Sequence, residues 1–507
     1  MEKEKNKKMT LQKWHIVLLI VGIIFLFIPA FHEDIWFDES YSVAIAKHSF
    51  ADIWTITGND VHPALYYWML HIIYLIFGNS VIAYRLFSVV AIAILGILGY
   101  THIRKDFGDK VGFWFSFFAF FLPVMNTYAA EIRMYSWSCL FVTLVAIYAY
   151  RLYKNVEENA DKKFKIKNLI LFGIFSIACC FIHYYALVTT GVINVMLLIY
   201  FILHRKEDKT MLRNFILLAV LQVLLYIPWL MYLIGQIIHV GRGFWITLDL
   251  STLVQVLSFQ FVRQLDSQFA FNAPTVIALV ASILMYVYIA YRIIKAKKQK
   301  LEMKPGILSL GLYLGIIGIM LCISLIRPIL FARYLLVLTG LYIFTFAYFI
   351  TQEEKKWLKI IIVTLICILA ITSNVQNILI NYDSSNMKQI EYLEENLQEG
   401  DIILYSNIGN GGVIAAFFPE YKQYFYNGAY WDVEEAYKAY GPGMETIYNY
   451  EDVLRDYHGR IWLIDSENMG MYNDEFPKKD TRIVEGPIRF DTKYQNYIYN
   501  ILLLEKE

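Results

Sequence analysis

The chain has 507 residues, of which 58% are hydrophobic, 17% are aromatic and only 18% are charged. Soluble domains average about 45–50% apolar and about 25% charged residues, so this composition excludes an ordinary soluble protein. The net charge of +1 says little about partners, and no feature of the sequence predicts nucleic-acid binding.

The chain begins with a short basic segment, Met1–Lys13, which holds five lysines and precedes the apolar run Trp14–Phe31. A signal peptide has an apolar core of about 7–15 residues, followed by small residues at a cleavage site. This run is longer and ends in His32, Glu33 and Asp34. We therefore expect an uncleaved first membrane helix whose N-terminus lies in the cytoplasm.

Further apolar runs follow along the chain, and a helix needs roughly 20 such residues to cross about 30 Å of hydrocarbon. This pattern predicts an all-α polytopic membrane protein. The eleven predicted spans lie at residues 14–32, 80–102, 111–128, 134–151, 168–183, 186–203, 214–235, 274–293, 306–326, 333–351 and 357–379.

Lys and Arg concentrate in the cytoplasmic loops of membrane proteins. Here six segments contain 27 of the 34 Lys and Arg residues that precede Tyr382, and we expect these segments to face the cytoplasm. Because the number of predicted spans is odd, the tail then lies outside. The six segments are 1–13, 103–110, 151–167, 204–213, 292–304 and 351–359.

The apolar segment Ala64–Phe77 is short for a span, and counting it as one would invert every later loop against the charge pattern. We therefore expect residues 33–79 to form one outer loop whose helices lie at the membrane interface. Trp36, Trp54 and Trp68 suit that depth, because amphipathic aromatic rings favour the headgroup level.

The polar tail predicts a second domain, so we expect a transmembrane catalytic domain at 1–382 and a small extracytoplasmic α/β domain at 383–507. The five cysteines all lie in apolar segments and predict no disulfide in the tail. Within the tail we expect strands at 401–405 and 460–464, helices at 387–397 and 432–440, and turns at 409–412 and 441–443.

Asp38 and Glu39 are the first candidates for chemistry, because they follow a membrane helix directly and lie between Trp36 and Tyr41. A carboxylate shielded from water in this way can have a raised pKa and act as a base. An acidic pair in an average loop is usually solvated surface. The position of this pair favours a functional role.

Two further groups lie on the same predicted side. Pro63 biases His62 toward an extended backbone, which could aim Asp60 and His62 into one outer pocket. A helix start with Asp60 as its cap explains these residues equally well. Glu131 and Arg133 are two residues apart before the fourth span, so each can meet a different partner, although a helix-end charge pair is the alternative.

His183 ends the fifth span, where a structural hydrogen-bonding role is the more common one. Arg327 and Arg333 flank a tight outer turn, and guanidinium groups pair bidentately with phosphate oxygens. Lipid headgroups are the alternative partners, and we favour a ligand phosphate at Arg333. No ligand spacing specifies a metal, so no cofactor is predicted, and a carboxylate-bound divalent ion lacks support.

Five motifs, in this order, resemble the GT-C glycosyltransferases of the protein O-mannosyltransferase and lipid A aminoarabinose transferase type over roughly residues 14–350. The motifs are Phe-Asp-Glu-Ser-Tyr, Asp-Val-His-Pro-Ala-Leu-Tyr-Tyr, Glu-Ile-Arg-Met-Tyr, His-Tyr-Tyr and Ala-Arg-Tyr-Leu-Leu. The family often has a second proline where this chain has Ala64, and the tail resembles no acceptor-binding domain.

The resemblance implies an inverting enzyme in which Asp38 is the catalytic base. The chemistry of the site suggests that the neighbouring Glu39 binds a sugar hydroxyl or positions Asp38. The donor would be a sugar on a polyprenyl phosphate. The motifs include or adjoin the residues that we expect to bind substrate: Asp60, His62, Glu131, Arg133, Tyr135, His183, Arg327, Arg333 and Tyr334.

The first hypothesis is therefore a glycosyltransferase of a bacterial plasma membrane. It would modify a cell-envelope glycan, lipid or protein at the outer face, and its helices would contact membrane lipids. One alternative is a transporter or flippase for a lipid-linked saccharide, which would need polar groups near mid-membrane. Another is a sensor or adhesion protein whose membrane part is inert, which would leave the one-sided clustering of polar residues without a reason.

Overall fold

The computed structural model describes residues 2–158, 160–242, 246–262, 273–430 and 433–507. The chain divides into two compact units. The helical unit comprises Met1–Pro29, Leu86–Ala130 and Met134–Gln376, and the mixed unit comprises Ala30–Arg85, Glu131–Arg133 and Asn377–Glu507.

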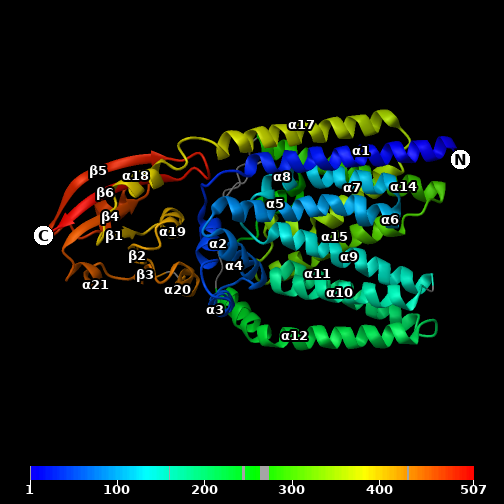
Figure 1. Cartoon of the computed structure of the whole chain (residues 1–507), viewed down its shortest axis with the longest axis horizontal. Helices are drawn as coiled ribbons and strands as arrows, with labels where there is room; N and C mark the ends of the chain where they lie inside the picture. The colour runs from blue at the N-terminus through cyan, green and yellow to red at the C-terminus, as the bar shows by residue number, and fades with distance from the viewer. Residues whose placement is uncertain (1, 159, 243–245, 263–272, 431–432) are drawn as a thin grey trace. The chain divides into compact units, whose positions relative to one another are not determined.

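Ten helical segments in the described residues are long and apolar enough to cross a membrane, and a bent pair raises the number to eleven if it is counted as one span. The long helices of the helical unit run roughly parallel to one another (Figure 1). These helices are α1 (Glu2–Phe27), α5 (Val81–Leu98), α9 (Tyr135–Glu157), α10 (Lys162–Ile182), α11 (Tyr184–Leu203), α12 (Lys209–Arg242), α14 (Ala273–Gln299), α15 (Lys304–Ser324), α16 (Thr339–Thr351) and α17 (Lys356–Asn381).

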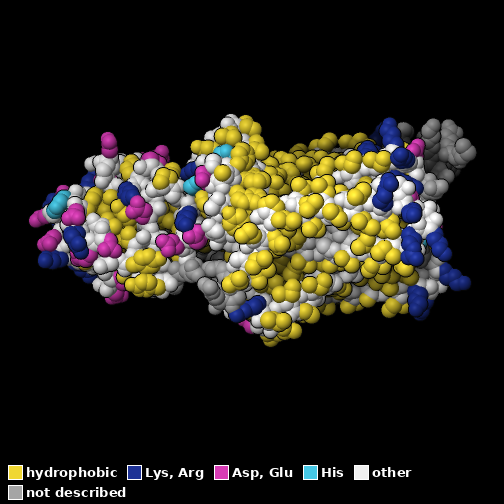
Figure 2. All heavy atoms as spheres, turned by 90° about the horizontal axis from the view of Figure 1, so that it is seen from below, with side chains coloured by type: hydrophobic (Ala, Val, Ile, Leu, Met, Phe, Trp, Pro, Cys, Tyr) yellow, Lys and Arg dark blue, Asp and Glu magenta, His cyan; other side chains and the backbone are white. Residues whose placement is uncertain are grey.

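The surface of the helical unit is apolar along the helices, while Lys and Arg side chains gather at the end where the N-terminus lies (Figure 2). On α12, only 6% of the most apolar window is buried inside the protein. A helix this apolar and this exposed requires a hydrocarbon environment. The fold is thus that of a multi-pass membrane protein.

The predicted span 111–128 is not one straight helix, and Pro123 explains the difference. α7 (Asp109–Phe121) and α8 (Pro123–Ala129) meet at an angle of 55°, with Leu122 in an extended conformation between them. Proline lacks an N–H donor and disfavours the helical conformation of the residue before it, so the helix breaks here. Shorter elements of the unit are η2 (Gly99–Ile103), α6 (Arg104–Phe107), α13 (Leu250–Ser258), η3 (Phe259–Phe261) and η4 (Ala332–Leu338).

The segment predicted as a single outer loop forms three helices of the mixed unit, α2 (Phe37–Ile45), α3 (Phe50–Asn59) and α4 (Leu65–Phe77). α4 has 13 residues, which is too short to cross the hydrocarbon core. Trp54 and Trp68 stack with their ring centroids 5.4 Å apart, which joins α3 to α4.

The C-terminal part of the mixed unit is built on a six-stranded sheet with the order β3-β2-β1-β4-β6-β5. β1 to β4 are parallel, whereas β6 runs antiparallel to both β4 and β5. Alternate residues such as Ile402, Leu463 and Leu502 form a core on one face. The strands are β1 (Ile402–Tyr405), β2 (Lys422–Tyr426), β3 (Met444–Ile447), β4 (Gly459–Asp465), β5 (Thr481–Asp491) and β6 (Ile498–Lys506).

The expected strands at 401–405 and 460–464 correspond to β1 and β4, and the helix expected at 387–397 is α18 (Lys388–Asn396). The helix expected at 432–440 is shorter and is split into α20 (Glu434–Tyr437) and η5 (Lys438–Tyr440), while Asp432 lies outside the described residues. The remaining short elements are η1 (Ile28–Ala30), α21 (Glu451–Leu454) and η6 (Met471–Glu475).

The prediction of a turn at 409–412 is wrong, because these residues lie in α19 (Ile408–Phe417). The Asn407 side chain caps the helix by accepting the Gly409 N–H at 2.8 Å. The glycines are required by packing: a Cβ at Gly411 would lie 2.1 Å from the Tyr405 ring, and one at Gly412 would lie 3.0 Å from Ser40 Oγ. α19 therefore packs closely against both β1 and α2.

Candidate functional site

Asp38 and Glu39 lie side by side in the first turn of α2, but their environments differ. Asp38 is half-buried, whereas the side chain of Glu39 is 0% exposed. Negative side chains in the first turn of a helix interact favourably with its dipole, which helps to explain why both carboxylates lie at this end of α2. The two carboxylates therefore differ in solvent access: Asp38 is partly exposed, and Glu39 is enclosed by the protein.

Glu39 is the centre of a buried hydrogen-bonded cluster. Arg85, near the start of α5, forms a bidentate ion pair with it, in which Nη1 lies 2.6 Å from Oε1 and Nη2 lies 2.9 Å from Oε2. The Ile132 N–H also donates to Oε1, at 3.0 Å, and the Tyr494 hydroxyl donates to Oε2, at 2.9 Å. Both carboxylate oxygens are engaged, so Glu39 anchors the first turn of α2.

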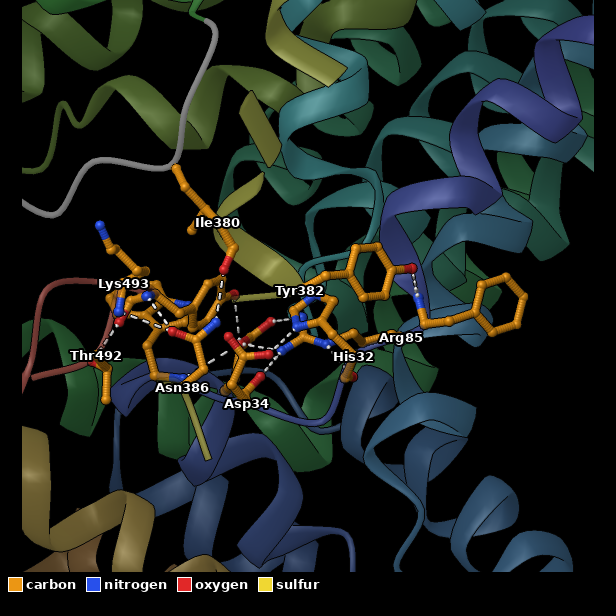
Figure 3. A network of polar contacts seen from close by, with 12 residues as sticks. His32, Asp34, Arg85, Ile380, Tyr382, Asn386, Thr492 and Lys493 are labelled. Carbon is orange, nitrogen blue, oxygen red and sulfur yellow. Dashed lines mark hydrogen bonds and ion pairs between the residues drawn. The ribbon is translucent and has the colours of Figure 1, made fainter. Parts of the chain in front are cut away.

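Arg85 also holds the segment that enters α2 (Figure 3). Its Nε donates to the His32 carbonyl at 3.3 Å, and its Nη2 donates to the Asp34 carbonyl. The His32 imidazole contacts the Asp34 carboxylate. Burial, and after it the charge of Arg85, lowers the pKa of His32, so this ring is neutral near pH 7.

Arg133 connects Asp38 to the second predicted group. Its Nη1 donates to the Asp38 carbonyl at 3.1 Å and to the Tyr67 hydroxyl at 3.2 Å. Its Nη2 lies 3.2 Å from His62 Nε2, and the same imidazole nitrogen lies 3.9 Å from the Asp60 carboxylate. Arg133 therefore brings three of the sequence-predicted residues into one cluster within the mixed unit.

Two tyrosines complete this cluster. The Tyr41 ring centroid lies 5.9 Å from that of His62 and 5.7 Å from that of Tyr67. Burial raises the pKa of both phenols above the ordinary value, and the charge of Asp60 adds to the shift, while Arg133 opposes it. Both side chains therefore remain neutral hydroxyls that can form hydrogen bonds but carry no charge.

Glu131 is buried in the same unit, with 2% of the residue exposed. Its carbonyl accepts the Arg133 N–H at 2.8 Å, and the next peptide N–H, that of Ile132, is the one bound by Glu39. The short segment Glu131–Arg133 thus holds α2 through Ile132 and reaches the Asp38 backbone through Arg133.

The other predicted residues belong to the helical unit, where His183 lies at the centre of an aromatic cluster. The His183 ring centroid lies 5.6 Å from that of Tyr135, 5.2 Å from that of Tyr334 and 5.7 Å from that of Tyr185. His183 is also the N-cap of α11, because its Nδ1 accepts the Tyr185 N–H at 3.1 Å. One ring nitrogen of His183 therefore serves the start of α11, and the ring itself packs among the tyrosines.

The two arginines of the outer turn differ from each other. Arg327 is exposed, and its main-chain N–H continues α15 by donating to the Ile323 carbonyl at 2.9 Å. Arg333 is half-buried, with its guanidinium carbon 5.0 Å from the centroid of the Phe331 ring. Stacking on an aromatic face orients a guanidinium group.

Sequence reasoning missed Arg85 and Tyr494, which hold Glu39. Arg85 could have been found, because an arginine inside an apolar run requires a buried partner. Tyr494 carried no such signal, since it is separated from Glu39 by 455 positions in the chain.

No group of three or more His, Cys, Asp or Glu side chains within the described ranges is arranged to hold a metal ion. The mixed unit has a small cavity beside the Glu39 cluster, lined by Asp34, Gln389, Thr492, Tyr494 and Tyr497 among others. The helical unit has an apolar cavity of about 70 Å³, lined by residues such as Phe107, Tyr150 and Phe344.

Comparisons with known proteins give one match to a family, over part of the chain, and one similar fold. Residues 61–232 match the family of the dolichyl-phosphate-mannose-protein mannosyltransferases. The structure of ArnT from Cupriavidus metallidurans in the apo state is similar over 97% of this chain and 98% of its own, with a TM-score of 0.64 and 10% identity. A search of curated proteins gives no match.

Two further solved structures match with lower scores. The same Cupriavidus metallidurans protein bound to undecaprenyl phosphate has a TM-score of 0.43 at 11% identity and covers 97% of this chain and 98% of its own. The oligosaccharyltransferase of Archaeoglobus fulgidus, in a complex with Zn and sulfate, has a TM-score of 0.46 at 11% identity. This match covers 95% of this chain and 73% of the oligosaccharyltransferase chain. From the apo structure and the family match, the chain has the GT-C glycosyltransferase fold of the protein O-mannosyltransferase and ArnT type, as its motifs predict.

Proposed function

We propose that this protein is an inverting glycosyltransferase that moves a sugar from a polyprenyl phosphate to a cell-envelope acceptor at the outer face of a bacterial plasma membrane. The observation that carries the proposal is the geometry of Asp38. Its carbonyl oxygen accepts a hydrogen bond from Arg133 at 3.1 Å, and its side chain is half-buried in the first turn of α2. A fixed, partly desolvated carboxylate in a GT-C fold suits a general base.

In the proposed reaction, an acceptor hydroxyl attacks the anomeric carbon of the donor sugar. A new C–O bond forms, the bond from the anomeric carbon to the phosphate oxygen breaks, and the hydroxyl proton passes to Asp38. The leaving polyprenyl phosphate takes the bonding electrons, and its charge requires cations. We assign the stabilisation of this charge to Arg333. Its guanidinium group stacks on the Phe331 ring, and we propose that this orients the group for a bidentate contact with the phosphate.

The remaining residues are assigned to substrate binding. Asp60, His62 and Arg133 offer polar atoms beside Asp38, and Glu131 is buried in the same unit. Tyr135, His183 and Tyr334 form the aromatic cluster of the helical unit, and the exposed Arg327 is assigned a weaker contact with phosphate groups at the surface. Glu39 is assigned to positioning Asp38, because Arg85, Ile132 and Tyr494 already bind its oxygens.

Asp38→Asn tests the assignment of the base. The purified protein is given a radiolabelled polyprenyl-phosphate sugar and candidate acceptors, and transfer is measured. We expect turnover to fall by about 10²–10⁴-fold, because an amide cannot accept the proton. Binding of the donor should be largely kept, since the proposal assigns the phosphate to arginine.

Asp52→Asn is the matched control, since Asp52 is an exposed carboxylate in the first turn of α3 in the same unit. It should leave turnover unchanged. Wild-type turnover in Asp38→Asn would remove Asp38 as the base, and a collapse of donor binding would contradict the division of roles between Asp38 and the arginines.

A further inference from the structure

We infer that the turn between β5 and β6 is a positioning element for Asp38, so that the C-terminal sheet forms part of the catalytic machinery. This inference rests on the proposed function, because it takes Asp38 as the reacting carboxylate. No sequence motif marked Tyr494 and Tyr497. The inference is that these two tyrosines fix the backbone on either side of Asp38.

The turn is built to present two tyrosines together. Gln495 and Asn496 both have positive φ, of 57° and 51°, which is the pattern of tight hairpin turns. Tyr494 and Tyr497 therefore occupy the two ends of a four-residue turn. The Thr492 N–H donates to the Tyr497 carbonyl at 2.9 Å, and the Tyr497 N–H donates to Thr492 Oγ1 at 3.0 Å, which closes the turn.

The turn is also anchored from outside the hairpin. The Asn386 side-chain oxygen accepts the N–H groups of Lys493 and Tyr494, both at 2.9 Å, and its amide donates to the Ile380 carbonyl at 2.7 Å (Figure 3). Asn386 is 3% exposed, so these bonds are shielded from water. A turn fixed on both sides can hold its hydroxyl groups in place.

The two hydroxyls contact the residues on either side of Asp38. The Tyr497 hydroxyl accepts the Phe37 N–H at 3.2 Å, and the Tyr494 hydroxyl donates to Glu39 Oε2 at 2.9 Å. The first N–H groups of a helix have no partner within it, so the Tyr497 contact satisfies a group that would otherwise be free. Arg133 also donates a hydrogen bond to the Asp38 carbonyl. The three consecutive residues Phe37, Asp38 and Glu39 of α2 are therefore each held by a group from outside the helix.

Position has a large effect on catalysis, because a shift of about 1 Å at a reacting group can cost about 10²-fold in rate. Burial raises the pKa of both Tyr494 and Tyr497, so their hydroxyls keep their protons and their hydrogen bonds across the working range of pH. The turn therefore orients the base without taking part in the proton transfer.

The test uses the full-length protein with Tyr494→Phe and Tyr497→Phe, each of which removes one hydroxyl and keeps the ring. We expect kcat to fall about tenfold or more in each variant, while the KM for the donor stays within about twofold. Tyr448→Phe is the matched control, because Tyr448 lies in the same sheet domain at its surface and should keep the wild-type kcat.

Wild-type kcat in both variants, or a rise in donor KM at constant kcat, would overturn the inference. Failure of both variants to fold would also overturn it, because the hydroxyls would then serve stability alone. The proposed function is tested separately, because Asp38 is removed as the base only if Asp38→Asn keeps the wild-type turnover.

Discussion

Arg85 and Glu39 are both buried, and each charge offsets the cost of burying the other. Isolated charges are costly to bury, and the bidentate contact and the added N–H and O–H donors offset this cost. Such pairs add little net stability relative to an apolar pair. We expect the pair to fix the position of both partners, which is the property required of a residue beside the proposed base.

Arg85→Met should therefore destabilise the protein by about 3–5 kcal/mol, because it leaves Glu39 buried without its counter-charge. The measurement is thermal unfolding of the purified protein in detergent. The double variant Arg85→Met with Glu39→Gln should recover part of the loss. Arg482→Met is the control, because Arg482 pairs with Glu505 at the surface, where its side chain is 69% exposed and an ion pair contributes about 0–1 kcal/mol. Equal losses in the two arginine variants would contradict this account.

At the scale of elements, the membrane helices were predictable because length and apolarity alone decide them. The break at Pro123 followed from a residue that was visible in the sequence, but a membrane helix can also tolerate proline, so the pattern alone did not decide it. The helical character of 409–412 was not predictable. Glycines usually mark turns, and here they permit close contact with Tyr405 and Ser40, which only the fold brings near.

Gly411→Ala tests this packing, because the new Cβ would lie 2.1 Å from the buried ring of Tyr405. Since the ring is fully buried, we expect a loss of about 1–3 kcal/mol in the free energy of unfolding, which is typical of overpacking. Gly470→Ala is the control, since the nearest atom to its Cβ would be 4.0 Å away, and it should be neutral or slightly stabilising. A neutral Gly411→Ala would show that α19 can move away from β1.

At the scale of the whole molecule, the candidate residues fall into two sets. Asp38, Glu39, Asp60, His62, Glu131 and Arg133 belong to the mixed unit, and Tyr135, His183, Arg327, Arg333 and Tyr334 belong to the helical unit. The sequence placed both sets on one side of the membrane from the charge of the loops. The structure adds that the first outer loop and the C-terminal sheet share one compact unit, a long-range arrangement that no local pattern records.

Cysteine labelling in intact cells tests the predicted topology. The tail has no cysteine of its own, so Lys479→Cys introduces a single exposed thiol into the sheet domain, and Lys206→Cys introduces one into a predicted cytoplasmic loop. A membrane-impermeant maleimide should modify the first variant in intact cells and the second only after permeabilisation, each measured against labelling of the native cysteines in the wild type. This follows from the excess of Lys and Arg at the end of the helical unit where the N-terminus lies, because basic loops stay on the cytoplasmic side. The reverse pattern would place Asp38 and the sheet in the cytoplasm and would remove the outer-face acceptor from the proposal.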